Sequence, residues 1–155
     1  MKNIAFYYSP IGRLAITTDG SALTKLYFPD EIIPEDVTYR ETDLLSETIH
    51  QLDEYFMGKR KYFTLPLKPE GSSFMQEVWE YLLQISYGEI KTYAEIAQKI
   101  KRPNAYRAVA LACSRNPLPI LIPCHRVIRK NGSLSGYRGG EKFKRYLIAL
   151  ELQYK

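Results

Sequence analysis

The chain has 155 residues and a mass of 18.0 kDa, which suits one average domain or two small ones. Its 45% hydrophobic content is ordinary for a globular protein, and its 13% aromatic content argues against intrinsic disorder. Residues 1–71 carry 8 Lys/Arg against 11 Asp/Glu, whereas residues 72–155 carry 14 against 6, a net of +8. The two cysteines and two histidines match no disulfide framework or zinc-binding spacing, and no apolar run approaches the roughly 20 residues of a membrane helix. We therefore expect no metal and no membrane contact; the charge indicates either a polyanionic partner for the second half or accidental scatter.

The start of the chain predicts β-strands. Residues 4–8, 14–18 and 23–28 are short runs rich in β-branched and aromatic side chains. They are separated by a Ser-Pro-Ile-Gly turn at residues 9–12 and by the hairpin dipeptide Asp19-Gly20. The pattern predicts a three-stranded antiparallel meander. The N-terminal residues also lack the long apolar segment of a signal peptide, so a cytoplasmic location is expected.

An acidic segment and one helix follow the strands. Residues 30–41 are acidic and contain Pro34, which predicts a loop. Asp43 is expected to cap a helix that runs to about Met57 and ends at Gly58. The buried stripe expected on this helix consists of Leu45, Ile49, Leu52 and Phe56, with His50 beside it as an exposed or half-buried residue.

The composition changes at the linker-like residues 68–71, Lys-Pro-Glu-Gly. We therefore expect an N-terminal α/β domain over residues 1–71 and a second domain over residues 72–155.

Capping signals predict helices in the second domain. Ser73 and Gln76 fit one capping box, and Thr92 opens a second, short helix with Glu95 at its third position. Asn104 is expected to cap a third helix over residues 105–114. The first of these helices is expected to bury Val78, Leu82 and Ile85, with Gly88 past its end.

The two short helices, joined by about four residues, indicate a helix-turn-helix, although a helical hairpin in any core has the same pattern. The basic turn favours a nucleic acid partner. The second helix lacks the long polar side chains that read bases, because Arg107 stands among small residues such as Ala105 and Ala108. This composition favours close approach to DNA and insertion of Arg107 where a base has left the stack; the alternative is that the alanines only pack the helix.

A reactive pair follows the helices. Residues 116–123 are apolar and contain three prolines, which predicts a rigid, buried loop. The loop leads to Cys124 and His125, and neighbouring side chains of an extended chain point to opposite faces, so we expect a water to bridge them. Glu151 is a candidate carboxylate to orient the histidine, whereas Cys113 is interpreted as a structural thiol.

The last segments carry weaker signals. Residues 130–133, Lys-Asn-Gly-Ser, predict a hairpin turn. The glycine-rich residues 136–140 predict either a loop whose backbone approaches a ligand or an ordinary linker. The final helix is expected to bury Phe143, Tyr146, Leu147 and Leu150.

Five ordered blocks within residues 72–151 resemble the O6-alkylguanine-DNA alkyltransferase family. The sequence Pro-Cys-His-Arg-Val at residues 123–127 is similar to the family signature. The supporting blocks are residues 88–93, 107–109, 116–123 and 136–140. The resemblance implies an α+β fold, with a ribonuclease H-like N-terminal domain built on a small antiparallel sheet. It also implies a mostly helical, winged-helix-like C-terminal domain that contains a helix-turn-helix.

The resemblance also implies roles for individual residues. Cys124 would be the nucleophile, His125 would act as its base through a water, and Glu151 would orient the histidine. Tyr93 would protonate the departing guanine and help to rotate the nucleotide out of the duplex. Asn116 would brace the turn that holds the cysteine.

Further residues are expected to contact DNA or the extruded base. Arg107 would fill the gap in the base stack. The other expected DNA contacts are Tyr93, Thr92, Ala105, Ala108 and Arg115. The expected base pocket consists of Val127, Tyr137, Arg138 and Pro119. Arg138 is a long side chain where some relatives have a small one, so we expect methylated guanine to be preferred over bulky adducts.

The implied activity is stoichiometric DNA repair by a methylated-DNA–protein-cysteine methyltransferase. The alkyl group of O6-methylguanine, and also that of O4-methylthymine, would pass to Cys124 after base flipping. The expected partner is double-stranded DNA containing O6-alkylguanine; the protein is expected to be a monomer without a cofactor. The family's occasional N-terminal metal site is not expected, because this chain lacks the Cys/His set for it.

Three other functions fit part of the pattern. One is a non-catalytic sensor of alkylated DNA, but such proteins lack the cysteine that this chain retains as Cys124. Another is a cysteine hydrolase that uses Cys124 and His125, which leaves the basic helical pair unexplained. The third is a plain DNA-binding regulator, in which Cys124 would be dispensable.

Overall fold

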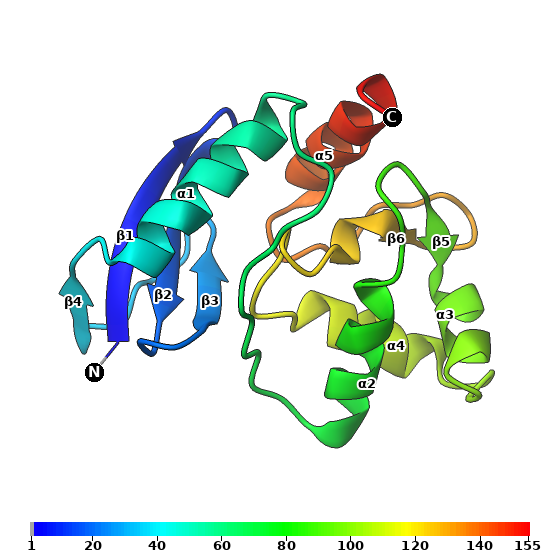
Figure 1. Ribbon diagram of the computed structural model, residues 1–155. Coiled ribbons are helices and arrows are strands. Elements are labelled where there is room, and N and C mark those ends of the chain that lie inside the picture. Colours follow the sequence, from blue (N-terminus) through cyan, green and yellow to red (C-terminus); the bar gives the residue numbers. More distant parts are fainter. Residues whose placement is uncertain (1) are drawn as a thin grey trace. The chain divides into compact units, whose positions relative to one another are not determined.

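The computed structural model describes residues 2–155, which form two compact units, residues 2–69 and residues 70–155 (Figure 1). Strands dominate the first unit and helices dominate the second. The predicted α+β fold is therefore confirmed. None of the helices in residues 2–155 is long and apolar enough to span a membrane.

The first unit contains a four-stranded sheet of β1 (Lys2–Ser9), β2 (Gly12–Thr18), β3 (Leu23–Tyr27) and β4 (Val37–Tyr39), in the order β3-β2-β1-β4. The predicted antiparallel meander is confirmed for β1, β2 and β3. The loop predicted over residues 30–41 is wrong at β4, which pairs with β1 in parallel. The open edge of β1 supplies backbone groups that this short extended segment satisfies.

Helix α1 (Asp43–Phe56) lies along one face of this sheet (Figure 1). It is capped by Thr42 and not by Asp43, because the Thr42 hydroxyl accepts from the Leu45 amide at 3.3 Å. Asp43 instead occupies the first turn, where the helix dipole favours a carboxylate. The Tyr7 hydroxyl donates to Asp53 at 3.1 Å and ties the helix to β1.

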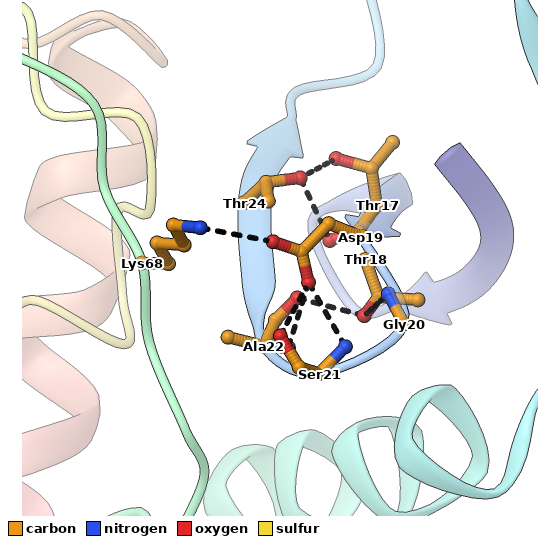
Figure 2. Close-up of polar contacts among 8 residues, drawn as sticks. All are labelled: Thr17, Thr18, Asp19, Gly20, Ser21, Ala22, Thr24 and Lys68. Atoms are coloured by element: carbon orange, nitrogen blue, oxygen red, sulfur yellow. Dashed lines mark hydrogen bonds and ion pairs between the residues drawn. The ribbon is translucent and has the colours of Figure 1, made fainter. Parts of the chain in front are cut away.

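The turn between β2 and β3 is organised by Asp19 (Figure 2). Its carboxylate accepts from the backbone amides of Ser21 at 2.9 Å and Ala22 at 3.0 Å, and Lys68 lies 3.6 Å away. The backbone bonds from Ser21 and Ala22 hold the pKa of Asp19 well below its usual range. Because Lys68 also donates its amide to the Leu23 carbonyl at 2.8 Å, the end of the unit is fastened to the edge of the sheet.

The second unit begins with α2 (Ser73–Leu82), followed by the short strand β5 (Lys91–Thr92), α3 (Tyr93–Lys99) and α4 (Tyr106–Ser114). A 3₁₀ turn, η1 (Cys124–Arg126), leads into β6 (Val127–Ile128), and α5 (Glu141–Gln153) closes the unit. Strands β5 and β6 pair in parallel. The buried Trp79 indole donates to the Ala112 carbonyl at 2.8 Å and joins α2 to α4.

In the second unit, the helix caps differ from the sequence prediction in two places. Ser72, and not Ser73, caps α2 by accepting from the Met75 amide, and the helix ends before Ile85. The capping box of Thr92 with Glu95 is confirmed. Asn104 does not cap α4, whose N-cap is Ala105 without a side-chain bond, because the preceding turn places the helix start one residue later.

Two predictions for the end of the chain are wrong. Residues 130–133 do not join two strands of a hairpin; the Gly132 amide closes a tight turn on the Arg129 carbonyl at 2.8 Å, and β6 pairs with β5 instead. Helix α5 buries Lys144 and Glu151 beside its leucines, whereas Tyr146 is 38% exposed. Lys144 and Glu151 therefore face inward beside Leu147 and Leu150, where the partners described below satisfy them.

Candidate functional site

The buried loop before Cys124 is held by one side chain. The Asn116 amide donates to the Ile122 carbonyl at 2.8 Å, and its oxygen accepts from the Leu118 amide at 2.9 Å. Asn116 is only 1% exposed, so both bonds are shielded from water. One side chain therefore closes the loop that positions the cysteine.

The cysteine and the histidine lie in a tight turn and not in extended chain. Cys124 and His125 belong to η1, which follows Pro123, and both are buried. The geometric premise of the sequence prediction, alternation along an extended segment, is therefore wrong at this point. The apolar, proline-rich loop ends in a helical turn, so the two side chains diverge by the angular step of a helix.

Glu151, near the end of α5, collects hydrogen bonds from three sides. Its oxygens accept from His125 Nε2 at 2.5 Å, from Arg126 Nε at 2.8 Å and from Arg126 Nη2 at 3.1 Å. The Gly88 amide donates to it at 3.1 Å. Burial raises the pKa of the Glu151 carboxyl, but His125 and Arg126 outweigh burial and the net pKa is far below the ordinary value. Glu151 is ionised at neutral pH.

Glu151 determines the tautomer of His125. An ionised carboxylate only accepts, so His125 Nε2 carries the proton that it donates to Glu151. Nδ1 then presents a lone pair, and within residues 2–155 it has no hydrogen-bond partner. Burial lowers the pKa of His125, although Glu151 opposes that effect. The histidine is neutral at pH 7 and is able to accept a proton at Nδ1.

Cys124 is a thiol that needs help to ionise. Burial raises its pKa, while the Asn116 amide, Lys144 and Arg138 each lower it. Cys113 is also buried, and burial raises its pKa well above the usual value. Only Cys124 has an adjacent histidine, so the two thiols differ in chemical setting.

Lys144 is a site residue that sequence reasoning missed. It is 1% exposed, and its Nζ donates to the Val127 carbonyl at 2.5 Å. The same ammonium lies 5.7 Å from the Tyr93 ring centroid and 5.8 Å from that of Tyr137. Burial lowers the pKa of Lys144, and the two cysteines raise it. No local motif marks this lysine; a charged residue on the expected apolar face of α5 is the only signal.

An open cleft of about 590 Å³ lies in the second unit. It is lined by residues from α3, α4 and the segment after β6: Tyr93, Ala94, Tyr106, Arg107, Ala110, Arg129, Lys130 and Asn131. Of the expected DNA contacts, it brings together only Tyr93 and Arg107. Arg129, Lys130 and Asn131 were not predicted, although the basic pair was visible in the sequence.

The other predicted residues lie elsewhere in the second unit. Thr92 caps α3, Ala105 is the N-cap of α4, Ala108 is an exposed residue of α4, and Arg115 is its exposed C-cap. Val127 and Pro119 are buried, and Pro119 bridges to Ile122. Tyr137 is buried next to Lys144, and the half-buried Arg138 lies close enough to lower the pKa of Cys124.

Residues 2–155 contain no group of three or more His, Cys, Asp and Glu side chains that could hold a metal ion. The chemical features of the second unit are thus a thiol, a histidine–glutamate–arginine network, a buried ammonium and a cationic cleft.

Comparison with known proteins adds to this picture. Residues 4–69 match the model of the 6-O-methylguanine DNA methyltransferase ribonuclease-like domain, and residues 73–153 match that of the DNA-binding domain of the same family. The constitutive methylated-DNA–protein-cysteine methyltransferase of Bacillus subtilis is 42% identical over 155 residues, covering 95% of this chain and 94% of the relative. A methylated-DNA–protein-cysteine methyltransferase of Methanosarcina mazei is 45% identical over 147 residues, covering 92% of each.

A crystal structure of Mycobacterium tuberculosis OGT in complex with DNA superimposes with a TM-score of 0.92 at 41% identity, covering 98% of this chain and 94% of that one. A ribonuclease-like domain joined to a DNA-binding domain with a buried cysteine beside a histidine defines the class of DNA alkyltransferases. Within that class, the chain belongs to the 6-O-methylguanine DNA methyltransferase family.

Proposed function

We propose that this protein repairs DNA by transferring the alkyl group from O6 of guanine to Cys124, and that each molecule acts once. The activity is that of a methylated-DNA–protein-cysteine methyltransferase. The single observation that supports it best is the buried Cys124 thiol next to a neutral His125, whose Nε2 is bonded to Glu151 and whose Nδ1 has a lone pair to offer.

The transfer begins with the thiol proton. The proton passes to His125 Nδ1 through a water, and the positive charge that develops on the imidazole is stabilised by Glu151 at 2.5 Å. The thiolate is stabilised in turn by the Asn116 amide and by the Lys144 and Arg138 cations, which lower the pKa of Cys124. Burial alone opposes ionisation of the Cys124 thiol. The thiolate therefore forms only with the help of these neighbouring groups.

The thiolate sulfur then attacks the alkyl carbon in line with the C–O6 bond. A carbon–sulfur bond forms, the carbon–oxygen bond breaks, and its electron pair moves into the guanine ring system. Tyr93 donates its hydroxyl proton to a ring nitrogen of the departing guanine; burial raises the pKa of Tyr93, so the hydroxyl is protonated at neutral pH. The product is a thioether, which no group of the site hydrolyses. No cofactor takes part.

DNA binding precedes the chemistry. The damaged nucleotide leaves the duplex, and Arg107 fills the gap that it leaves. Thr92, Ala105, Ala108 and Arg115 contact the duplex near the two helices. The extruded base lies among Val127, Tyr137, Arg138 and Pro119. The protein acts as a monomer in the cytoplasm. It also accepts O4-methylthymine. It prefers methyl groups to bulkier adducts, because the Arg138 side chain narrows the base pocket.

Counting methyl groups tests this function. With excess duplex containing O6-methylguanine, we expect the wild-type protein and Cys113→Ser to restore one guanine per protein molecule and then stop. Cys124→Ser should restore none while retaining DNA affinity. Continued turnover would contradict suicidal transfer. Tight binding without any restored guanine in the wild type would favour the alternative function, a non-catalytic sensor of alkylated DNA.

A further inference from the structure

The cleft has a cationic wall that the proposed chemistry does not use. Arg129 and Lys130 line it together with Arg107 of α4, so three of its eight lining residues are cations. None of the eight is acidic. Lys130 is exposed, and within residues 2–155 its ammonium makes no hydrogen bond or ion pair. A concave surface with several cations and no carboxylate attracts a polyanion.

The segment that carries these cations is held in a tight turn by local hydrogen bonds. The Gly132 amide donates to the Arg129 carbonyl at 2.8 Å, and the Arg129 amide donates to the Ser133 carbonyl at 3.2 Å. Asn131 accepts from the Ser133 amide at 3.0 Å. Gly132 adopts a φ of +86°, which L side chains rarely adopt, so glycine permits this tight turn. A preorganised turn loses little conformational entropy when it binds a ligand.

The other residues of the cleft have properties that suit a nucleotide next to these cations. Tyr93 and Tyr106 contribute aromatic side chains to the lining, and Ala94 and Ala110 contribute small ones. Its volume of about 590 Å³ falls within the roughly 300–1,000 Å³ that is usual for sites of small ligands. Every nucleotide of a strand carries a phosphate, so a strand that enters this cleft offers anionic groups to its cationic lining.

We propose that Arg129 and Lys130 form a phosphate-binding turn, which holds the backbone of the DNA strand that enters the cleft. This inference builds on the proposed function and deepens it, because it assigns to these two residues DNA affinity and not alkyl transfer. Arg107 and the turn then contact one strand from different elements, α4 and the segment after β6. The contact is to phosphate, so it is independent of base sequence.

Salt dependence of binding to an undamaged duplex tests the proposal. Each phosphate contact contributes a slope of about −0.9 to the plot of log affinity against log salt. We expect Lys130→Ser to weaken binding and reduce the slope by about one unit, and the double variant Arg129→Gln/Lys130→Ser to reduce it by about two units. Lys130→Arg should restore the wild-type slope. Lys142→Ser is the matched control, an exposed lysine of α5 outside the cleft, and should leave the slope unchanged.

The possible outcomes are distinguishable. A double variant with the same slope and affinity as Lys142→Ser would overturn the proposal. Because the duplex is undamaged, the experiment does not depend on alkyl transfer: a protein that binds with the expected slopes but restores no guanine would contradict only the proposed function. A thermal melt of each variant tests whether it is folded. Because the variants are expected to lose DNA affinity only, their alkyl-transfer rate at saturating DNA should equal that of the wild type. A transfer rate that stays below that of the wild type at saturating DNA would place the turn in the chemical step and would also overturn the proposal.

Discussion

Glu151 joins His125 and Arg126 in one buried network, since its carboxylate accepts hydrogen bonds from both side chains. Replacing the carboxylate with an amide removes the charge that stabilises a protonated His125. We therefore expect Glu151→Gln to slow alkyl transfer by about 10²-fold or more, a size typical of lost general-base assistance. Single-turnover rates measured across pH give the test, with affinity for undamaged DNA as the control. An unchanged rate would show that His125 does not act as the base.

Lys144 is a buried cation close to both cysteines and to the rings of Tyr93 and Tyr137. Removing its charge removes one of the groups that lower the pKa of Cys124. We expect Lys144→Met to slow alkylation of Cys124 by iodoacetamide several-fold at neutral pH and to move its pH profile to higher pH. The exposed Lys142→Met serves as the control. A profile that coincides with that of the wild type would contradict this role.

At the scale of an element, the loop of residues 116–122 depends on Asn116 more than on any regular structure. Asn116→Ala leaves the buried Leu118 amide without its partner, while the Ile122 carbonyl loses one of two donors and keeps the Cys124 amide at 2.8 Å. A buried unsatisfied group costs about 1–3 kcal/mol, so we expect a loss of at least that size in the free energy of unfolding. Urea denaturation measures the loss. An unchanged midpoint would mean that the prolines alone hold the loop.

The elements show how far sequence reasoning reaches. The meander and the Thr92 capping box follow from local signals, a two-residue alternation and a four-residue motif, and both were predicted correctly. Strand β4 and the inward position of Lys144 on α5 were not, because both depend on partners distant in sequence. Three residues of β4 need the edge of β1, and burial of Lys144 needs the Val127 carbonyl.

The candidate site, like the fold, was predicted correctly only where local sequence or the resemblance marked its residues. Neighbouring residues and a named resemblance were enough to select Cys124, His125 and Glu151 as candidates. The 3₁₀ turn at Cys124 was missed, because the preceding prolines suggested that extended chain would continue. Lys130 was missed as a cleft residue, because nothing in the local sequence relates the turn after β6 to the face of α4.

At the scale of the whole molecule, stability should fall with acidification in two stages. The folded-state pKa of His125 is lowered, so below its unfolded value of about 6.5 the unfolded chain binds a proton that the folded chain does not. The pKa values of Glu151 and Asp19 are lowered as well; their stabilisation is fully present above about 4.3 and is lost as pH falls through the folded values.

Urea midpoints measured from pH 8 to pH 3 test this expectation. The midpoint should be level above pH 7, decline below about 6.5 and decline more steeply below about 4. Asp19 lies in the first unit, and Asp19→Asn should make only the decline of the midpoint below about pH 4 smaller. A midpoint that rises on acidification would contradict the signs of all three shifts.

The central claim is that Cys124, and not the equally buried Cys113, receives the alkyl group. Trypsin separates the two thiols, because cleavage after Arg107, Arg115 and Arg126 places Cys113 in residues 108–115 and Cys124 in residues 116–126. We would incubate the protein with a duplex containing one O6-methylguanine and measure the masses of both peptides. The account predicts one methyl group on residues 116–126 and none on residues 108–115. A methyl group on residues 108–115, or a guanine that stays methylated while both peptides remain unchanged, would contradict it.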